Sequence, residues 1–424
     1  MTFKIALVGC GGMGRRHAHG YIELRKYFDS VSMVAVCDVH YDVAEKVADE
    51  VGNATGSRPV IYTDFDQMLN QADLDGIAIV TSTPRHHSFA IKAMRSGLHV
   101  ITEKPMGLTL KACRQMRETS RATGKVMAVA ENYRRDPMNR LTKALIDSDA
   151  IGTPYFTLDM HAVSSQGAVM HSTVWRAKKD QAGGMVLDGG VHNADMLLYL
   201  MGEVDVVYAE TAIFEQHRTL RPMIEVAPGL AQMYDHRKEV DYAIGDDVQQ
   251  TAVDSAFGVI RFKTGALGQL SMTDASHGQS LAASTISGST GTLYRPGNRS
   301  GESPRIVGID GAEITGDALL EMVPDFELDE ITSILWDGAK RISSYDLDFQ
   351  ITDSKIIAYE YLDMVRAAET GDDPEVGPQA GMDALALAYA LIESRVAGLP
   401  ISVEDVAEGR VSEFQDEIDE AMGI

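Results

Sequence analysis

The chain has 424 residues, of which 45% are hydrophobic and 24% are charged. At about 150 residues per domain, this length predicts two or three domains, each able to bury a core of its own. The 38 basic and 62 acidic residues give a formal net charge of -24, a field that repels phosphate backbones and anionic lipid headgroups. Binding to nucleic acid or to a membrane surface is therefore not expected.

Cysteine usage and the N-terminus indicate a cytoplasmic protein. The three cysteines, Cys10, Cys37 and Cys113, have no paired spacing, which argues against a disulfide framework and against a zinc site built from cysteines. The chain opens with an apolar run and a glycine-rich turn, without the basic segment of an export signal. No apolar run reaches the roughly 18 residues that a membrane helix needs.

Residues 4–133 alternate short apolar runs with helical patterns. Nearly continuous apolar strands between helices are typical of a parallel sheet covered on both faces, the doubly wound α/β class. We expect residues 1–133 to form such a dinucleotide-binding domain. The expected strands are 4–8, 32–37, 60–62, 76–80, 99–102 and 126–130, and the expected helices are 15–28, 43–51, 65–70, 87–96 and 110–123.

After residue 151 the rhythm changes to longer strands with alternating polarity and hairpin turns. Residues 256–262 and 266–273, joined by Lys263, Thr264 and Gly265, are the clearest hairpin. This pattern predicts a second, α+β domain over residues 134–424, with a large open and mainly antiparallel sheet. Within it we expect a connecting helix at about 137–147, an insertion at about 215–247 and an acidic helical tail at 404–424.

A glycine-rich turn follows the first strand. Gly9, Gly11 and Gly14 match G-x-G-x-x-G, in which the glycines permit a tight turn, close approach to a pyrophosphate and close helix packing. The helix that follows offers free N–H groups and the positive end of its dipole. Gly12 and Met13 complete the predicted phosphate-binding turn. The alternative is a purely structural turn.

Asp38 ends the second expected strand, where a ribose-binding acid belongs. A carboxylate at this position accepts hydrogen bonds from the ribose hydroxyls and repels a 2′-phosphate. Because Val39, His40 and Tyr41 include no arginine, the sequence favours NAD over NADP. The alternative is an ordinary surface aspartate.

Polar residues follow the fourth expected strand. Thr81, Thr83, Pro84 and His87 lie at its carboxyl end, the edge of a doubly wound sheet that holds the ligand. We assign these four residues to cofactor binding. An ordinary strand-to-helix loop, with His87 in the first turn of the helix, is the alternative.

Glu103, Lys104 and Pro105 follow the fifth expected strand. A lysine fixed there beside the nicotinamide would act as a proton acceptor if burial lowered its pKa. Glu103 and Lys104 are also assigned to the cofactor site. A surface lysine followed by a proline that starts a helix is the alternative.

A further glycine-rich segment, residues 182–195, precedes a helical pattern that ends at Gly202. Asp188 and His192 are four residues apart, so both can project from one helical face. A carboxylate beside an imidazole orients the ring and tunes its basicity, as acid–base catalysis requires. Two alternatives stay open: a capping aspartate with a structural histidine, or a metal site that adds Asp195.

These four motifs, in this order and spacing, resemble the Gfo/Idh/MocA oxidoreductases, the family of glucose–fructose oxidoreductase and inositol dehydrogenase. The likeness runs from Ile5 to about Gly202 and continues more weakly through 257–276, 286–292 and 381–403. It implies a Rossmann domain followed by an α/β domain whose open sheet often forms the interface of a homodimer or homotetramer. It also implies NAD(P)-linked chemistry at a sugar or cyclitol hydroxyl.

The resemblance implies the catalytic set Lys104, Asp188 and His192, with no metal. Hydride transfer to the nicotinamide accompanies removal of the hydroxyl proton by His192 or Lys104, and the sequence leaves open which of them is the base. Asp188 is expected to orient the pair. The family pattern is exceeded by the 215–247 insertion and by the acidic tail, both of which can reshape the substrate pocket.

Aromatic and basic residues near these motifs are candidates for the substrate pocket. An aromatic face suits the C–H side of a sugar, and arginine suits its oxygens. The assigned residues are Tyr133, Arg134, Trp175, Arg176 and His192, with weaker support for His161 and His171. Core aromatic residues with surface arginines are the alternative.

Two other functions stay open. One is a glycoside-cleaving enzyme of the same fold, in which a ring hydroxyl is oxidised transiently, the glycosidic bond breaks by elimination and NAD is restored in place. The other is a dinucleotide sensor without catalysis. Net release of NADH distinguishes the dehydrogenase from the glycoside-cleaving enzyme.

Overall fold

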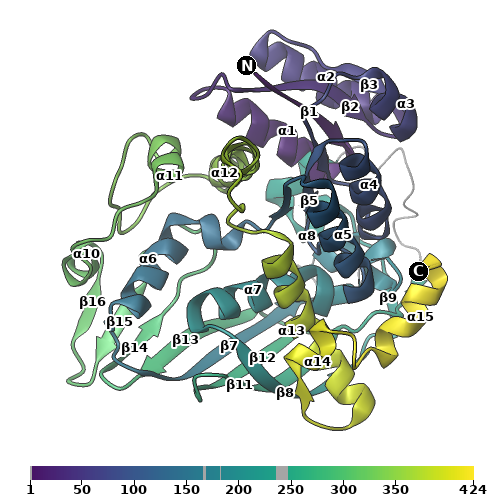
Figure 1. Ribbon diagram of the computed structural model, residues 1–424. Helices are drawn as coiled ribbons and strands as arrows, with labels where there is room; N and C mark the ends of the chain where they lie inside the picture. Colours follow the sequence, from purple (N-terminus) through teal and green to yellow (C-terminus); the bar gives the residue numbers. More distant parts are fainter. Residues whose placement is uncertain (1, 166–168, 182, 235–246) are drawn as a thin grey trace.

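The structure is a computed structural model that describes residues 2–165, 169–181, 183–234 and 247–424. Two large sheets organise the chain, one in each half (Figure 1). The first has six parallel strands in the order β3-β2-β1-β4-β5-β6. The second has nine strands in the order β16-β15-β14-β13-β7-β12-β11-β8-β17. The doubly wound parallel sheet and the large, mainly antiparallel sheet predicted from the sequence are both present.

The first sheet is buried on both faces by helices. All of its strands except β3 contain runs of buried residues, as a parallel sheet between two helical layers requires. The strands are β1 (Phe3–Val8), β2 (Val31–Cys37), β3 (Val60–Tyr62), β4 (Gly76–Ile79), β5 (His99–Glu103) and β6 (Met127–Ala130). The helices between them are α1 (Gly12–Leu24), α2 (Tyr41–Thr55), α3 (Phe65–Gln71), α4 (Thr83–Arg95) and α5 (Leu110–Thr123).

Local signals set the ends of these helices. The side chain of Asp64 accepts a hydrogen bond from the Gln67 N–H at the start of α3, and Thr109 caps α5 in the same way through the Ala112 N–H. Gly124 ends α5 in the left-handed conformation, which glycine adopts without strain. These local signals fix where α3 begins and where α5 begins and ends.

The second sheet is covered by helices on one face. Its strands are β7 (Pro154–Ser164), β8 (Val204–Ala212), β11 (Ser255–Phe262), β12 (Leu267–Ser276), β13 (Leu281–Gly288), β14 (Gly291–Tyr294), β15 (Arg305–Gly308), β16 (Glu313–Thr315) and β17 (Ile401–Ser402). Burial alternates along β11, with alternate side chains in the core and the others exposed. The predicted hairpin is the β11–β12 pair, whose register joins Arg261 to Leu267. One pair, β12 with β7, is parallel.

Helices of the second half cover this sheet and return to the first. They are α6 (Pro137–Asp147), α7 (Gly190–Met201), α10 (Asp317–Met322), α11 (Glu330–Leu335), α12 (Phe349–Thr370) and α13 (Pro378–Ala397). Helix α6 coincides with the predicted connecting helix. Helices α7 and α13 lie over the second sheet in Figure 1. Helix α12 instead packs beside α1, and its buried side chains share a core with β1 and α1, so residues 349–370 rejoin the first half.

The predicted insertion contains short elements. They are β9 (His217–Thr219), α8 (Met223–Val226), a 3-10 segment (Pro228–Tyr234) and β10 (Asp247–Gln249), with β9 and β10 paired antiparallel. The rest of the insertion, residues 235–246, lies outside the described residues. The 3-10 segment packs against α1, next to the glycine-rich turn. The insertion therefore reaches the predicted cofactor site.

The acidic tail is helical where the sequence predicts it. Helices α14 (Val403–Ala407) and α15 (Glu413–Met422) form it, and α15 packs against α5 and α13. Thr109 donates a hydrogen bond to Asp419 at 2.5 Å, and the Leu110 N–H donates to Gln415 at 3.0 Å. The tail thus caps the first helical layer. In the described parts of the chain, no helix is both long and apolar enough to cross a membrane.

Candidate active site

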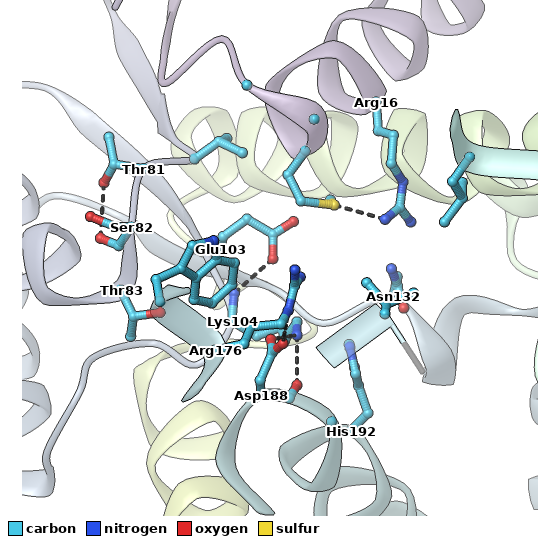
Figure 2. Close-up of a pocket in the computed structure, with 18 of the residues that line it drawn as sticks. Arg16, Thr81, Ser82, Thr83, Glu103, Lys104, Asn132, Arg176, Asp188 and His192 are labelled. Atoms are coloured by element: carbon cyan, nitrogen blue, oxygen red, sulfur yellow. Dashed lines mark hydrogen bonds and ion pairs between the residues drawn. The ribbon is translucent and has the colours of Figure 1, made fainter. Parts of the chain in front are cut away.

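A cavity of about 510 Å³ lies where the carboxyl ends of the first sheet face the start of α7. Figure 2 shows its polar side chains converging from both halves of the chain. The lining includes Gly11, Gly12, Met13, Thr81, Thr83, Glu103, Lys104, Tyr133, Trp175, Arg176, Asp188 and His192. Residues that are more than 80 positions apart in the sequence therefore meet at one place.

The glycine-rich turn has the geometry that its motif predicts. Gly9 has a φ of 90°, and a Cβ atom there would overlap the carbonyl oxygen of Val80. A Cβ atom on Gly14 would overlap the carbonyl oxygen of Gly9, so only glycine permits this approach of α1 to β1. The ring of Tyr234, from the insertion, lies against Gly12. The turn and the N-terminus of α1 form a cradle of backbone N–H groups at the cavity.

Asp38 is tied to this turn. Its carboxylate accepts hydrogen bonds from the Cys10 N–H at 2.8 Å and from the His40 N–H at 3.0 Å. The aspartate therefore lies beside the first glycines, which is where the motif places a ribose-binding carboxylate. Together with the glycine cradle and the helix N-terminus, it fits the demands of an NAD-type dinucleotide without a 2′-phosphate.

The segment after β4 is divided between the cavity and the core. Thr81 and Thr83 line the cavity, together with Ser82. Pro84 occupies the first turn of α4 and does not line it. His87 lies outside the cavity lining and pairs with Gln115 at 2.6 Å, so the structure does not support its assignment to the cofactor.

His86, the histidine beside it, lines the cavity instead. Its ring nitrogens lie 3.0 Å from the carbonyl oxygens of Thr81 and Pro105. His86 therefore joins the loop after β4 to the loop after β5. The helical turn of α4 decides which of the two neighbouring histidines faces the site, and the sequence pattern did not resolve it.

Lys104 lies in a cluster of charges at the centre of the cavity. Its Nζ donates to the Asp188 side chain at 2.9 Å and to the Asp188 carbonyl oxygen at 2.7 Å. Arg176 holds the other Asp188 oxygen at 2.7 Å through Nε. Burial raises the pKa of Asp188, but the two cations outweigh it and keep the carboxyl pKa well below its usual range. Asp188 is therefore ionised and fixed between two positive charges.

The pKa of Lys104 corrects a prediction from the sequence. Burial alone lowers the pKa of its ammonium, as predicted, but the charges of Asp188 and Glu103 outweigh burial and raise the pKa above its ordinary value. Lys104 consequently remains a cation near neutral pH. It is a hydrogen-bond donor in this arrangement, and the expected lowering of its pKa by burial is not found.

Glu103 fixes the backbone that carries Lys104. One carboxylate oxygen accepts the Lys104 N–H at 3.0 Å, and the other lies 3.0 Å from Nε2 of His17 on α1. Nδ1 of His17 lies 3.1 Å from the hydroxyl of Tyr361 on α12. The peptide bond between Lys104 and Pro105 is cis. This chain of contacts anchors the lysine to two helices of the first core.

His192 pairs with a glutamate that the sequence analysis missed. Its Nδ1 lies 2.7 Å and 2.8 Å from the two carboxylate oxygens of Glu131, which follows β6. The ring stacks on Tyr133 with centroids 4.2 Å apart. Burial lowers the pKa of His192, and the nearby charge of Lys104 lowers it further against the opposing effect of Glu131. The ring is neutral at neutral pH. Its Nδ1–H donates to Glu131, and Nε2 carries no proton.

Asp188 and His192 do not pair with each other as predicted: Asp188 pairs with Lys104, and His192 pairs with Glu131. Asp188 belongs to a π-helical turn, Met185–Gly189, that precedes α7, and its carboxylate faces Lys104 and Arg176 rather than the imidazole. Glu131 takes the orienting role expected of Asp188. The spacing of four residues brought both side chains to the cavity, but the extra residue per turn of the π-helical segment changed their relative direction.

Of the five predicted substrate residues, four line the cavity and one, Arg134, does not. Tyr133 and Trp175 line the cavity with their rings. Arg176 also lines it, and its guanidinium forms an ion pair with Asp188. Arg134 does not line it, because it forms a buried ion pair with Asp195. The same ion pair removes Asp195 from the metal-site alternative, and within the described residues no cluster of three possible metal ligands is found.

The weaker substrate candidates also lie outside this cavity. His161 pairs with Asp159 at 2.8 Å on β7, and His171 is buried in the segment before Trp175. Further lining residues had no motif in the sequence. Arg16, Asn132 and Arg299 belong to this group. Arg299 lies over the Tyr133 ring at 5.2 Å and donates to Asp353 at 2.8 Å, contacts that only folding reveals.

Two family models match the chain. One, described as an oxidoreductase family with an NAD-binding Rossmann fold, matches residues 3–131, and the other, described as the GFO/IDH/MocA C-terminal domain, matches residues 139–294. Together with the two-sheet architecture, they define the class of protein. The chain belongs to the Gfo/Idh/MocA oxidoreductase family, and its N-terminal domain is that family's NAD-binding Rossmann fold.

Named relatives act on sugars. The chain is 31% identical over 212 residues to D-apiose dehydrogenase of Paraburkholderia graminis, a match that covers 50% of this chain and 52% of the relative. It is 28% identical over 280 residues to levoglucosan dehydrogenase of Pseudarthrobacter phenanthrenivorans, covering 66% and 69%. The chain therefore spans about half of the first relative and about two thirds of the second.

A solved structure has the same fold over nearly the whole chain. Levoglucosan dehydrogenase in complex with NADH and L-sorbose superimposes with a TM-score of 0.73 at 22% identity, covering 96% of this chain and 100% of that chain. At this identity the similarity establishes the architecture alone. It extends the likeness beyond residue 294, where the second family model ends.

Proposed function

We propose that the protein is an NAD-dependent dehydrogenase that oxidises a ring hydroxyl of a sugar, a sugar derivative or a cyclitol, or reduces the corresponding ketone. The observation that carries this proposal is the meeting of a charged Lys104 and a neutral His192 in one cavity beside the glycine-rich turn. A hydroxyl that loses a proton and a hydride needs both a base and a positive charge near its oxygen.

The residues that would hold NAD belong to the first domain. We assign its pyrophosphate to the Gly9–Gly14 turn and the α1 N-terminus, and its adenosine ribose to Asp38. Thr81, Thr83 and Glu103 line the approach from that turn to Lys104. When bound, NAD supplies the hydride acceptor. The chain's own side chains handle the proton and the charge.

His192 is the base in this proposal. Its Nε2 is bare because Nδ1 carries the proton donated to Glu131, so the ring can accept a hydroxyl proton from substrate. Glu131 then stabilises the imidazolium and keeps the ring in place. The stacking of Tyr133 on the ring restricts its rotation. Of the two bases left open by the sequence, the pKa directions favour His192 over Lys104.

Lys104 stabilises the oxygen as it loses its proton. Asp188 and Glu103 maintain the charge of the ammonium, and Arg176 prevents Asp188 from turning away. An ammonium fixed in a buried site stabilises a developing alkoxide more strongly than one in water. Asp188 is therefore assigned to positioning Lys104. Tyr133 and Trp175 offer aromatic faces to the C–H side of a ring.

Incubation with a carbohydrate panel tests the proposal. Purified protein, NAD and individual pentoses, hexoses, anhydrosugars, inositols and aryl glycosides are followed at 340 nm for NADH and by chromatography for free aglycone. We expect NADH in stoichiometric amounts with the ketone product from at least one member. Aglycone release without NADH would replace the proposal by transient oxidation and glycosidic cleavage, and inactivity on the whole panel would remove both.

A matched pair of variants tests whether the reaction takes place in this cavity. His192→Ala should lose the activity found in the panel, whereas His217→Ala should retain it, because His217 is exposed in the β9–β10 insertion and pairs with Asp247 away from the cavity. Equal activity of the two variants would exclude the assigned site. Retained NAD binding by both, measured by quenching of protein fluorescence, separates catalysis from cofactor binding.

Two further features support our proposals for the assembly and the location of the protein. The uncovered face of the second sheet exposes apolar side chains of Phe156, Leu158, Phe257, Val259 and Leu267, a surface that a homodimer or homotetramer would bury. Within the described residues all three cysteines are buried free thiols, as is usual in a reducing compartment. We assign the protein to the cytoplasm, as a homo-oligomer.

A further inference from the structure

A second cavity, of about 570 Å³, adjoins the active site. It lies between the covered face of the second sheet and the start of α7, and it shares Tyr133 and Gly189 with the first cavity. The proposed reaction uses none of its other residues. Tyr133 stacks on His192, so the partition between the two cavities is a ring in contact with the proposed base.

The polar part of this cavity is a buried cluster around Arg295. Its Nε donates to the Ser284 hydroxyl at 3.0 Å, and its Nη2 lies 3.2 Å from Asp159. Asp159 also accepts from Ser284 at 2.7 Å and pairs with Nε2 of His161 at 2.8 Å. Only 3% of the Arg295 side chain is exposed, and its Nη1 has no partner among the described residues.

An unpartnered buried guanidinium N–H is costly, and because Arg295 lines the cavity, a polar group bound there would lower that cost. The charge of Arg295 is compensated by Asp159, so the cluster favours an uncharged acceptor over an anion. His161 also lines the cavity, with Nε2 held by Asp159, and the side-chain amide of Asn193 in its wall carries both a donor and an acceptor. The cavity therefore offers a donor and an acceptor, as a sugar ring with adjacent hydroxyls requires.

Its other walls suit the C–H surface of a ring. Tyr133 and Tyr294 contribute aromatic side chains, and Val163, Met185 and Ala282 contribute apolar ones. A volume of about 570 Å³ lies within the range of about 300–1,000 Å³ typical of small-molecule sites. The first cavity has to admit the nicotinamide end of NAD and the reacting ring, so the second is left for a different group.

We propose that the second cavity is a subsite for a second hydroxylated ring joined to the reacting one. This inference rests on the proposed function and narrows it: the substrate is a glycoside of disaccharide size, with the reacting ring against Lys104 and His192. The second ring lies beyond Tyr133, where it contacts Arg295 and His161.

Paired ligands test the inference in the wild-type protein. Calorimetry with NADH present measures the dissociation constants of methyl glycosides and the matching disaccharides: methyl β-D-glucoside with cellobiose, methyl α-D-glucoside with maltose and methyl β-D-galactoside with lactose. We expect at least one disaccharide to bind about tenfold more tightly than its methyl glycoside, because the second ring satisfies a charged donor. Equal binding in every pair, or no binding of any disaccharide, overturns the inference.

Filling the second cavity sharpens the test. Ala282 pairs with His161 across β13 and β7, so its side chain lies on the same face as the Arg295 cluster. Ala282→Phe should reduce the preference for the disaccharide about tenfold. Leu281→Phe is the matched control, because Leu281 is exposed and its side chain lies on the opposite face of the strand.

The outcomes separate this inference from the proposed function. An unchanged disaccharide preference in a folded Ala282→Phe variant overturns the subsite, and thermal unfolding of both variants verifies the fold. If Ala282→Phe does not fold, the wild-type ligand pairs decide alone. NADH formation from monosaccharides or inositols, without any disaccharide binding, would overturn the subsite and leave the dehydrogenase intact. Tight disaccharide binding without oxidation of any ligand would support the subsite and overturn the dehydrogenase activity.

Discussion

Two neighbouring clusters in the active site each pair a basic group with carboxylates. In one cluster the basic group is charged, and in the other it is neutral. Lys104 faces Asp188 and Glu103, and the two negative charges raise the pKa of its ammonium in spite of burial. Burial lowers the pKa of His192, and its one carboxylate neighbour, Glu131, does not reverse this because the positive charge of Lys104 acts in the same direction as burial. Burial acts on both groups in the same direction, and the number and sign of neighbouring charges decide the result.

This difference divides the proposed chemistry between two side chains. A lysine that remains charged stabilises an oxygen but does not take its proton, whereas a neutral imidazole accepts the proton. The two groups also come from different domains. Removing either basic group tests this division of roles directly. Changing the carboxylate beside His192, or the pH, tests the charge state assigned to each group.

The largest expected effect comes from removing the charge at Lys104. Lys104→Ala should lower kcat about 1,000-fold, because the developing alkoxide loses its fixed cation. Steady-state NADH formation measures it, with Lys92→Ala, an exposed lysine of α4, as the control. A loss below about tenfold would contradict the role assigned to Lys104.

Removing the imidazole should cost less, because water can accept the proton in its place. His192→Ala is expected to lower kcat about 100-fold, within the range for loss of a general base. Added imidazole should restore part of the activity in this variant and none in Lys104→Ala. Rescue of both variants, or of neither, would contradict the assignment of the base to His192.

Neutralising the carboxylate that orients the imidazole should have a smaller effect. Glu131→Gln retains the shape of the side chain but not its charge, and we expect kcat to fall about tenfold through poorer stabilisation of the imidazolium. The charge of Glu131 raises the pKa of His192, so its loss should move the acid limb of the pH profile to lower pH. A limb that moves to higher pH would show that another group titrates.

The smallest effect is expected from pH in the neutral range. The pKa of His192 is lowered from its ordinary value near 6.5, so the base is already deprotonated at about pH 7, and kcat/KM should change less than about twofold between pH 7 and 9. Activity should fall only at pH values below the ordinary imidazole pKa of 6.5, as the ring takes a proton. An alkaline loss between about pH 8 and 9 would indicate that Lys104 titrates there, contrary to its raised pKa.

Much of the architecture was predictable because its signals are local. Alternation of apolar runs and helices indicated the first sheet, and alternation within strands indicated the second. The connecting helix at Pro137–Asp147 starts at a proline, and its boundaries follow from the sequence. The return of α12 to the first core was not predictable, because its long apolar face identifies no particular partner.

The chain by itself determined the glycine-rich turn, Asp38 at the end of β2, and the presence of Lys104, Asp188 and His192 at strand and helix ends. These are short motifs whose chemistry depends on neighbours in sequence. Only the tertiary structure decided that His192 pairs with Glu131, that Asp188 fixes Lys104, and that Arg134 and His87 face away from the cavity. Charge states depend on every group within a few ångströms, and folding places those groups from segments that no sequence spacing relates.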